Sequence, residues 1–332
     1  MKRILLIQTA SIGDVILATP LIEKINDVLP NYALDILIKR GNQKKLFESH
    51  PYINNVLTWN KDSRKYLNLI NLLGVIRKNK YDIVINMQRF ASTGFLTAFS
   101  GAPERIGFDK NPFSFKFTEK VKHIINKNDN DLHEVDRNLI LLQKYSTSND
   151  YKIKLYPSIL DIDFVSSYKD ERYICIAPSS LWFTKQFPEH KWVEFLKKTD
   201  QNLKVYLLGS KGDVEMNEEI IFDANHPKAV NLAGKLSLIQ SAALMKDAVM
   251  NFVNDSAPLH LASAMNAKVT VIYCSTVPAF GFGPKSDDAV IIEEKSNLKC
   301  RPCGVHGKSK CPKKHFKCAN DIDINELTKR IS

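Results

Sequence analysis

The segment RILLIQTASIGDVILATPLIEKINDVL, residues 3–29, decides the fold of this chain. Its apolar run Ile4–Ile7 is typical of a buried strand, and Val15–Leu29 has the pattern of a helix. Gly13 and Asp14 therefore lie where a strand gives way to a helix. In open α/β sheets, ligands bind beyond the carboxyl ends of the strands. The segment predicts an α/β fold with the Asp14 carboxylate at a binding edge.

Asp14 is the first candidate for chemistry. The helix dipole stabilises an ionised carboxylate near a helix start by about 0.3–1 kcal/mol at exposed sites. Such a group could accept a proton from a substrate held at the sheet edge. The alternative is a capping aspartate, which is common at this position. Gly13 stands alone in the turn, so the G-x-G-x-x-G fingerprint of a dinucleotide site is absent there.

Length and composition indicate a globular protein with two domains. The chain has 332 residues, of which 44% are hydrophobic and 25% are charged. No apolar run approaches the length of a membrane-spanning helix, so none is expected. The run Ile4–Ile7 is too short for the core of a secretory signal, and Gln8 interrupts it. We therefore expect the protein to act in the cytoplasm.

Strand and helix patterns alternate along both halves of the chain. Strands are predicted at Arg3–Gln8, Ala33–Ile38, Asn54–Trp59, Ile83–Met87, Tyr173–Ala177, Val205–Leu208, Val230–Leu232, Val249–Val253, Val269–Tyr273 and Val290–Glu293. Helices are predicted at Asp14–Leu29, Leu67–Arg77, Ser92–Phe99, His133–Tyr145, His190–Lys198, Val214–Phe222, Leu236–Met245 and Ala257–Met265. Residues 106–130 are predicted to be loop with some strand. Alternation of this kind is typical of parallel βαβ units.

The alternation predicts two Rossmann-like domains that face a cleft. Residues 1–150 are expected to form the first domain and residues 171–320 the second. A linker is predicted at residues 151–170, where Pro157 and scattered polar residues change the character of the chain. Residues 321–332 are expected to form a C-terminal helix.

The charge of the chain favours anionic partners. The formal net charge is +11, which suits nucleic acid, phosphorylated small molecules or an anionic membrane face. Between Lys295 and Lys317 there are eight Lys or Arg residues and no Asp or Glu. Binding of nucleic acid favours aromatic side chains among the basic ones, and Phe316 is the only one here. The sequence therefore predicts no nucleic-acid partner, and a solvated surface remains the alternative for this segment.

Residues 254–260, Asn-Asp-Ser-Ala-Pro-Leu-His, follow a predicted strand and open a helix. Free N–H groups at a helix start favour phosphate, and Pro258 has no N–H to lose in the first turn. His260 lies four residues after Ser256, so the two share one helix face. The alternative is an Asp/Ser cap with His260 on the surface.

Residues 178–188 also follow a predicted strand. Lys185 in this segment is suited to neutralising a diphosphate, and Thr184 adds a hydroxyl donor. The alternative for Lys185 is an ordinary surface lysine.

Four cysteines lie close together near the C-terminus, at Cys300, Cys303, Cys311 and Cys318. The first pair has the spacing of zinc ligands, whereas the later gaps are less typical. A structural zinc ion is possible here, and a disulfide pair or free thiols are the alternatives. Cys175 and Cys274 fall in or beside predicted strands and are expected to be buried core thiols.

Together these segments resemble glycosyltransferase family 9, the bacterial lipopolysaccharide heptosyltransferases. The similar segments are Arg3–Leu29, Tyr81–Phe108, Pro178–Pro188, Val205–Gly209, Val230–Ser237 and Asn254–Ala264, which run along nearly the whole chain. The resemblance implies a GT-B fold with the donor site mostly on the C-terminal domain. It also implies an inverting, metal-independent transfer of heptose from ADP-heptose to an inner-core sugar on lipid A.

The resemblance also implies roles for single residues. Asp14 matches the catalytic general base, and Lys185, with Thr184, matches the clamp on the donor phosphates. Asp255, Ser256, Ala257 and His260 match the donor motif Asp-Ser/Thr-Gly-x-x-His. Candidate acceptor contacts are Ser11, Gly13, Arg89 and Arg105.

Three positions depart from the family pattern. Ala257 and Ser179 stand where glycine is usual or frequent, and Phe187 stands where tryptophan is usual. An alanine would be strained if the backbone had a positive φ at residue 257, and harmless in an ordinary first helical turn.

The implied reaction also sets the expected partners and location. The acceptor is a phosphorylated lipid on the cytoplasmic face of the inner membrane, so we expect peripheral association with an anionic membrane surface. No cofactor is expected to be required. The alternatives are a GT-B transferase that uses a UDP- or GDP-hexose, and a non-catalytic protein that binds nucleotide sugars or nucleic acid.

Overall fold

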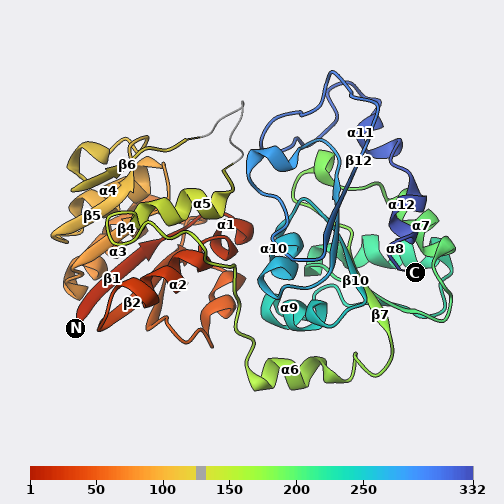
Figure 1. Cartoon of the computed structure of the whole chain (residues 1–332), viewed down its shortest axis with the longest axis horizontal. Coiled ribbons are helices and arrows are strands. Elements are labelled where there is room, and N and C mark those ends of the chain that lie inside the picture. Colours follow the sequence, from red (N-terminus) through yellow and green to blue (C-terminus); the bar gives the residue numbers. More distant parts are fainter. Residues whose placement is uncertain (125–131, 332) are drawn as a thin grey trace. The chain divides into compact units, whose positions relative to one another are not determined.

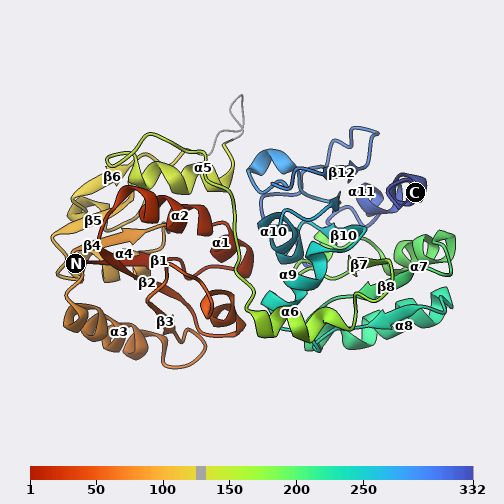
Figure 2. The same ribbon diagram turned by 60° about the horizontal axis from the view of Figure 1, so that its bottom comes forward.

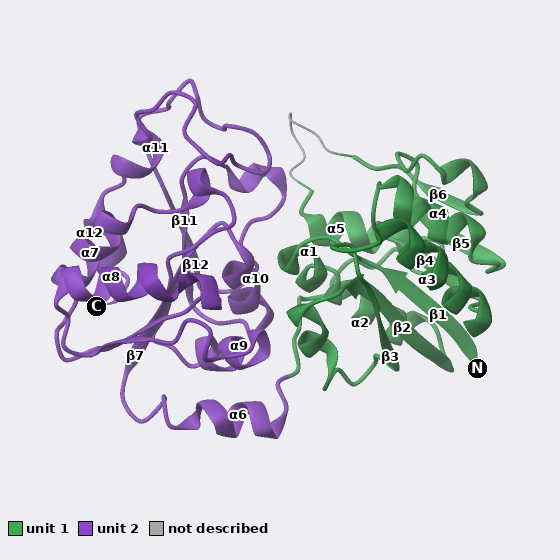
Figure 3. Ribbon diagram, turned by 180° about the vertical axis from the view of Figure 1, so that it is seen from behind, with its two compact units in different colours: residues 1–156 green, residues 157–332 purple. Residues whose placement is uncertain are grey.

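The computed structural model describes residues 1–124 and 132–331 and divides the chain into two compact units. Unit 1 comprises Met1–Tyr156 and unit 2 comprises Pro157–Ser332 (Figure 3). The predicted loop at residues 125–130 and the last residue of the predicted C-terminal helix lie outside the described residues. Each unit contains one six-stranded sheet with helices packed around it.

Unit 1 alternates strands and helices from its first residues (Figure 1). Its strands are β1 (Lys2–Ile7), β2 (Tyr32–Lys39), β3 (Asn55–Trp59), β4 (Ile83–Asn86), β5 (Glu104–Phe108) and β6 (Glu119–Val121). Its α-helices are α1 (Ile12–Ile16), α2 (Thr19–Val28), α3 (Lys65–Asn79), α4 (Ala91–Phe99) and α5 (Glu134–Leu139). Short 3-10 turns are η1 (Asn42–Phe47), η2 (Ser114–Lys116) and η3 (Ile140–Leu142).

Unit 2 repeats the alternation. Its strands are β7 (Tyr173–Ala177), β8 (Lys204–Leu207), β9 (Ala229–Asn231), β10 (Met250–Asn254), β11 (Val269–Tyr273) and β12 (Ala289–Glu293). Its α-helices are α6 (Ile159–Ser166), α7 (Glu189–Lys198), α8 (Val214–Ala224), α9 (Leu238–Lys246), α10 (Ala257–Ala264), α11 (Lys317–Asn320) and α12 (Ile324–Thr328). Its 3-10 turns are η4 (Phe183–Lys185), η5 (Lys211–Asp213) and η6 (Pro278–Phe280).

The two sheets have the same strand order. The order is β3-β2-β1-β4-β5-β6 in unit 1 and β9-β8-β7-β10-β11-β12 in unit 2, and every recorded pairing is parallel. This is the order of the Rossmann fold, in which ligands bind where the strand order reverses. The reversal falls between β1 and β4 in one sheet and between β7 and β10 in the other. The prediction of an α/β chain with two Rossmann-like domains is confirmed.

The inner strands of each sheet are buried on both faces, so β4, β7, β10 and β11 are buried along their whole length. In unit 1, Leu5 and Ile7 pack with apolar side chains of α3 and α4. Their neighbours Ile4 and Leu6 point to the opposite face and are fully buried. Helices α2 and α5 pack together on that opposite face (Figure 2). In unit 2, α7, α8 and α12 surround one core, and α9 packs with α6 and α10.

The helix predicted over Asp14–Leu29 is instead two helices, α1 and α2, and this prediction was wrong in one detail. Pro20 is the second residue of α2. In a continuous helix the proline ring would clash with the carbonyl of the residue four positions earlier. Proline also has no N–H to donate to that carbonyl. The hydroxyl of Thr19 bonds that carbonyl, Ile16 O, at 2.8 Å instead. As a result α1 is a separate short helix that presents Asp14.

Two further elements differ from the prediction. The helix predicted over His133–Tyr145 is shorter, because α5 ends at Leu139 and continues as the 3-10 turn η3. The predicted linker contains the helix α6, which begins at a capping box formed by Ser158 and Asp161. None of the helices in the described ranges has the length and apolar character needed to cross a bilayer.

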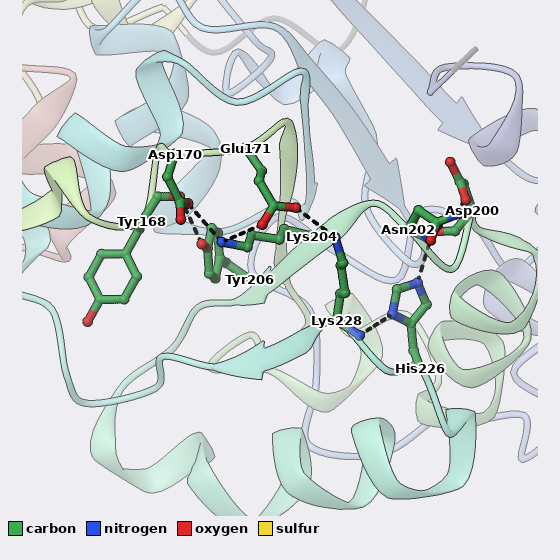
Figure 4. A network of polar contacts seen from close by, with 9 residues as sticks. All are labelled: Tyr168, Asp170, Glu171, Asp200, Asn202, Lys204, Tyr206, His226 and Lys228. Carbon is green, nitrogen blue, oxygen red and sulfur yellow. Dashed lines mark hydrogen bonds and ion pairs between the residues drawn. The ribbon is translucent and has the colours of Figure 1, made fainter.

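A charged network joins the beginnings of three strands in unit 2 (Figure 4). Lys204, the first residue of β8, pairs with Asp170 at 2.7 Å and Glu171 at 3.3 Å, just before β7. Glu171 also pairs with Lys228, just before β9, at 2.7 Å. These groups lie at the amino ends of the strands, the edge opposite the one where ligands bind. We therefore interpret the network as structural.

Candidate functional site

Asp14 lies in the first turn of α1, directly beyond the carboxyl end of β1. It forms a capping box with Ser11, whose N–H and hydroxyl donate to Asp14 Oδ2 at 3.1 and 2.5 Å. Gly13 is buried between them. Both bonds use Oδ2, and no recorded bond within the described residues engages Oδ1. The capping interpretation is therefore confirmed, and the capping box uses one oxygen of the carboxylate.

Asp14 shares its surroundings with other charged groups. Burial raises the pKa of Glu134 above its usual value, and the negative charge of Asp14 adds to this effect. The positive charges of Arg137 and Arg89 act on the pKa of Glu134 in the opposite direction. Arg137 Nε donates to Glu134 Oε2 at 2.8 Å. The structure thus brings two predicted site residues, Asp14 and Arg89, into one electrostatic neighbourhood.

Arg105 is placed differently. It is the second residue of β5, three residues before the carboxyl end of the strand and thus about 10 Å from that edge. Its guanidinium donates to the backbone carbonyls of Ala102 and Lys116. Acceptor binding by Arg105 stays a prediction, and this placement does not support it.

Sequence reasoning missed a polar network at the reversal point of the first sheet. Thr9 follows β1, Gln88 follows β4 and Lys61 follows β3. The Thr9 hydroxyl donates to Gln88 Oε1 at 2.7 Å. Lys61 Nζ donates to Thr9 O at 2.7 Å and to Thr9 Oγ1 at 2.9 Å. The sequence feature that could have identified Lys61 is its position two residues after the end of a predicted strand.

Lys61 is a partly desolvated cation at this edge. Burial lowers its pKa to about 8, with the charges of Lys39 and Lys65 adding to the effect and Asp62 opposing it. Its ammonium also lies 4.7 Å from the centre of the Trp59 ring. Below that pH the edge therefore carries a positive charge, a suitable partner for an anionic substrate.

In unit 2, Lys185 and Asp255 meet across the reversal point of the second sheet. Lys185 ends the turn η4 after β7, and Asp255 follows β10. Their Nζ and Oδ2 atoms are 2.7 Å apart, and the Lys185 side chain is 15% exposed. The Thr276 hydroxyl donates to the same oxygen at 2.6 Å. Lys185 is therefore a positioned cation rather than a freely moving surface lysine.

Asn254 joins the two motif segments. Its Nδ2 donates to Pro178 O at 2.6 Å, and its Oδ1 accepts from the Phe187 N–H at 3.0 Å. The side chain is fully buried. This single amide fixes both ends of the segment that carries Lys185, so Asn254 is a positioning residue that sequence reasoning did not identify.

Thr184 is held by the cysteine-containing loop, residues 299–316. Lys308 N–H donates to Thr184 Oγ1 at 2.8 Å, and Thr184 N–H donates to Lys308 O at 3.0 Å. The Ser275 hydroxyl donates to Thr184 Oγ1 at 2.9 Å, and Cys303 N–H donates to Ser275 O at 2.8 Å. Thr184 is almost completely buried. Its hydroxyl therefore anchors the loop, which makes Thr184 a positioning residue for Lys185.

The start of α10 supplies backbone donors beside Lys185. Ser256 caps the helix in an extended conformation, and its own side chain makes no capping hydrogen bond. Ala257 is the first helical residue, and neither it nor Ser179 has a positive φ. Neither departure from glycine therefore strains the backbone. His260 is buried, so the alternative that placed it on the surface was wrong.

The cysteines are free thiols. Cys175 and Cys274 are fully buried, as predicted, and burial raises the pKa of both thiols. Cys303 donates its thiol to Cys300 O at 3.4 Å. Within residues 1–124 and 132–331, no group of three or more His, Cys, Asp or Glu side chains is arranged to hold a metal ion. The charges of Cys303, Cys311 and Cys300 nevertheless act on the pKa of the Cys318 thiol, so the four side chains lie near one another, and a structural zinc ion stays a prediction.

Known proteins resemble this chain along most of its length. The family model of glycosyltransferase family 9 (heptosyltransferase) matches residues 70–314. Lipopolysaccharide heptosyltransferase 3 of Escherichia coli is 24% identical over 278 residues, which cover 80% of this chain and 81% of that protein. The solved structure of E. coli ADP-heptose LPS heptosyltransferase II matches with a TM-score of 0.80 and 20% identity, covering 100% of this chain and 97% of that one.

A second solved structure, E. coli heptosyltransferase WaaC with ADP, matches with a TM-score of 0.71 and 18% identity, covering 99% of this chain and 100% of that chain. These likenesses and the two Rossmann-like sheets confirm the GT-B fold. The family model spans well over half of the chain. The chain therefore belongs to glycosyltransferase family 9, the heptosyltransferases, and is a glycosyltransferase.

Proposed function

We propose that this enzyme transfers heptose from ADP-heptose to an inner-core sugar of lipopolysaccharide, with inversion at the anomeric carbon and without a metal ion. One observation carries the proposal. A carboxylate with a remaining oxygen lies at the reversal point of the first sheet, and a positioned lysine beside a helix start lies at that of the second. Such a pair supplies both requirements of the reaction, a base and an anion site.

The donor belongs on unit 2. Lys185 Nζ and the N–H groups of Ser256 and Ala257 are the positive groups at that edge. A diphosphate gains charge-assisted hydrogen bonds from them, since helix starts favour phosphate. Of the two solved relatives, one is an ADP-heptose transferase and the other is a heptosyltransferase with ADP. This supports an adenine nucleotide as the carrier.

The acceptor belongs on unit 1. Asp14 Oδ1 takes the proton of the acceptor hydroxyl as that oxygen attacks the anomeric carbon. Ser11 holds the carboxylate in place through Oδ2. Lys61 and Arg89 supply positive charge at the same edge for a phosphorylated core. The general base contributes about 10²–10⁴ in rate.

In the proposed reaction the bond between the anomeric carbon and the diphosphate oxygen breaks as the new glycosidic bond forms. The electron pair of the broken bond leaves with ADP, whose oxygens face Lys185 and the start of α10. Preorganised positive groups of this kind stabilise the charge that develops in the transition state. We propose that they take the place of a divalent cation. Because the acceptor is anchored in the cytoplasmic face of the inner membrane, the enzyme works there as a peripheral protein.

A panel of nucleotides tests the donor half. ADP, UDP, GDP and CDP are titrated separately into the full chain while its melting temperature is followed, since a ligand that binds only the folded protein raises it. The proposal predicts the largest shift with ADP. A larger shift with UDP or GDP would replace ADP-heptose by a hexose donor. Transfer from ADP-heptose to a delipidated core oligosaccharide, followed by NMR of the new linkage, then tests the reaction and its inversion.

A further inference from the structure

Exposed large apolar side chains are concentrated on one part of unit 1. Apart from Met1, those in the described residues of this unit lie on α3, on α4 with its capping residue Phe90, or in the segment that follows β5. They are Tyr66, Leu67, Ile70, Val75, Phe90, Phe99 and Phe115. Tyr66 is 76% exposed and Phe115 is 71% exposed. A contiguous apolar surface on a globular domain marks a binding face more often than scattered apolar residues do.

These residues lie on neighbouring elements of unit 1. Helices α3 and α4 pack against each other and share the core that lies on one face of the sheet (Figure 2). Phe95 of α4 packs against that core and contacts Phe99 and Phe113, with ring centres 5.0 and 6.1 Å away. Phe113 in turn stacks on Phe115. We name this face, formed by α3, α4 and residues 110–122, the α3–α4 surface.

The α3–α4 surface is strongly positive. Residues 64–80 contain five Lys or Arg and no Asp or Glu, and residues 110–122 contain four Lys and one Glu. Lys116 Nζ lies 5.5 Å from the ring centre of Phe99 and 5.9 Å from that of Phe115. Lys65 Nζ lies 5.8 Å from the ring centre of Tyr66. Cations therefore lie directly beside the exposed rings.

We infer that the α3–α4 surface binds an anionic lipid bilayer. Aromatic rings enter the interface between headgroups and acyl chains, and lysines beside them contact anionic headgroups, each adding to membrane attraction. A partner protein of matching charge would have to be acidic over this whole face while burying exposed aromatic rings. The bilayer satisfies both requirements at once.

The position of the surface connects it with the acceptor. Phe90 caps the start of α4 and directly follows Arg89, at the carboxyl edge of the first sheet. Tyr66 lies in the first turn of α3, which starts at the same edge. Docking by this surface therefore brings the bilayer to the edge that carries Asp14. The inference rests on the proposed function, because a lipid-linked acceptor makes such docking useful.

Vesicle flotation with the purified full chain tests the inference. The probes are vesicles of phosphatidylcholine alone and vesicles that also contain phosphatidylglycerol. Wild type is expected to float with the anionic vesicles only. The double variant Tyr66→Ser/Phe115→Ser should lower the partition coefficient about tenfold or more, because two exposed rings lose their apolar contact. Lys116→Glu should lower it as well. Phe222→Ser is the matched control, since Phe222 is 84% exposed on α8 of unit 2.

Three readouts separate this inference from the proposed function. Melting temperature and ADP affinity should not change in the variants, which excludes misfolding. Transfer to a delipidated oligosaccharide should keep its rate, whereas transfer to acceptor embedded in vesicles should fall. Equal flotation of wild type and the double variant, or an equal loss with Phe222→Ser, would overturn the docking surface. If flotation depends on the α3–α4 surface but the wild-type protein transfers no sugar, the docking surface stands and only the proposed function is overturned.

Discussion

Lys185 Nζ lies 2.7 Å from Asp255 Oδ2, and this ion pair joins the segment after β7 to the end of β10. The Thr276 hydroxyl bonds the same carboxylate oxygen. Because the lysine is held by a partner that is largely buried, little side-chain freedom remains to be lost when a diphosphate binds. The Lys185 side chain is therefore positioned for the proposed donor before the donor binds.

Replacing Lys185 with alanine is expected to weaken ADP binding about 10- to 100-fold, because a hydrogen bond to a charged group contributes about 1.5–3 kcal/mol. The transfer rate should fall too, since the same charge faces the leaving group. Isothermal titration with ADP measures the affinity. Lys198→Ala is a suitable control, because Lys198 is a lysine of the same unit that pairs with Glu194 on the surface of α7. Unchanged ADP affinity in Lys185→Ala would remove Lys185 from the donor site.

Asp14→Asn is expected to lower the transfer rate about 10²–10⁴-fold, because the amide no longer accepts the proton. ADP affinity should stay within about twofold, since the proposed function places Asp14 on the acceptor side. Initial rates with a saturating soluble acceptor measure the loss.

The control for Asp14→Asn is Asp161→Asn. Asp161 forms the same capping box with Ser158 at the start of α6, with bonds of 3.0 and 2.6 Å to its Oδ2. It therefore reports the effect on stability of the same change in an equivalent capping box, without the chemistry. Turnover of Asp14→Asn within about tenfold of wild type would show that Asp14 is only a cap.

Local sequence pattern was sufficient for the fold but not for the contacts of the site. Parallel strands buried on both faces leave long apolar runs, so all strands but β5 and β6 could be placed, and Asp14, Lys185 and Asp255 could be assigned to strand ends. The network of Lys61, Thr9 and Gln88 could not, because its members are up to 79 residues apart along the chain. Such contacts depend on which strands become neighbours, and short-range periodicity does not encode that order.

The same limit applies to the cysteine-containing loop. Its cysteine spacing predicts zinc, which stays a prediction, but the spacing gives no sign of the loop's hydrogen bonds to Thr184, 124 residues away. The break between α1 and α2 was in principle readable, since Pro20 marks it.

Gly307→Ala is expected to weaken ADP binding and slow transfer, although Gly307 itself lies outside the proposed donor site. Gly307 has φ +76°, and a Cβ there would lie 2.9 Å from Lys185 Cγ and 3.2 Å from Thr184 Oγ1. Because the Cβ would lie too close to Lys185, the lysine side chain must move. Such a shift should lower turnover roughly 10- to 100-fold, because catalysis depends strongly on the position of the groups involved. The readouts are the ADP dissociation constant and the initial rate of transfer.

Gly304→Ala provides the comparison for Gly307→Ala. Gly304 lies in the same loop with φ +120°, but a Cβ there would meet nothing within 4 Å. Both variants carry a backbone penalty, and only Gly307→Ala presses on Lys185. Equal effects of the two substitutions on ADP affinity would show that backbone strain, rather than the position of Lys185, is responsible.

Binding of a phosphorylated acceptor is expected to depend on pH through Lys61. Its pKa is lowered to about 8 by burial, so its charge is present below that pH and is lost above it. The KM for a phosphorylated acceptor should therefore rise as the pH increases through about 8, while kcat changes less. Lys61→Arg should abolish this rise, because a guanidinium stays charged throughout the range. A KM profile that is the same in wild type and Lys61→Arg would assign acceptor binding to other groups.

Lys61 also affects the free energy of unfolding, and this readout does not depend on the acceptor. Its pKa is about 8 in the folded chain, against 10.5 for an ordinary solvated lysine, so between these values the unfolded state binds more protons than the native state. Stability should therefore gain a contribution from this residue as the pH rises through that window. Lys61→Met removes the titrating group, and urea unfolding at a series of pH values compares the two slopes. The slope of wild type should exceed that of Lys61→Met between about pH 8 and 10.5, and parallel slopes would show that the lysine titrates normally in the folded protein.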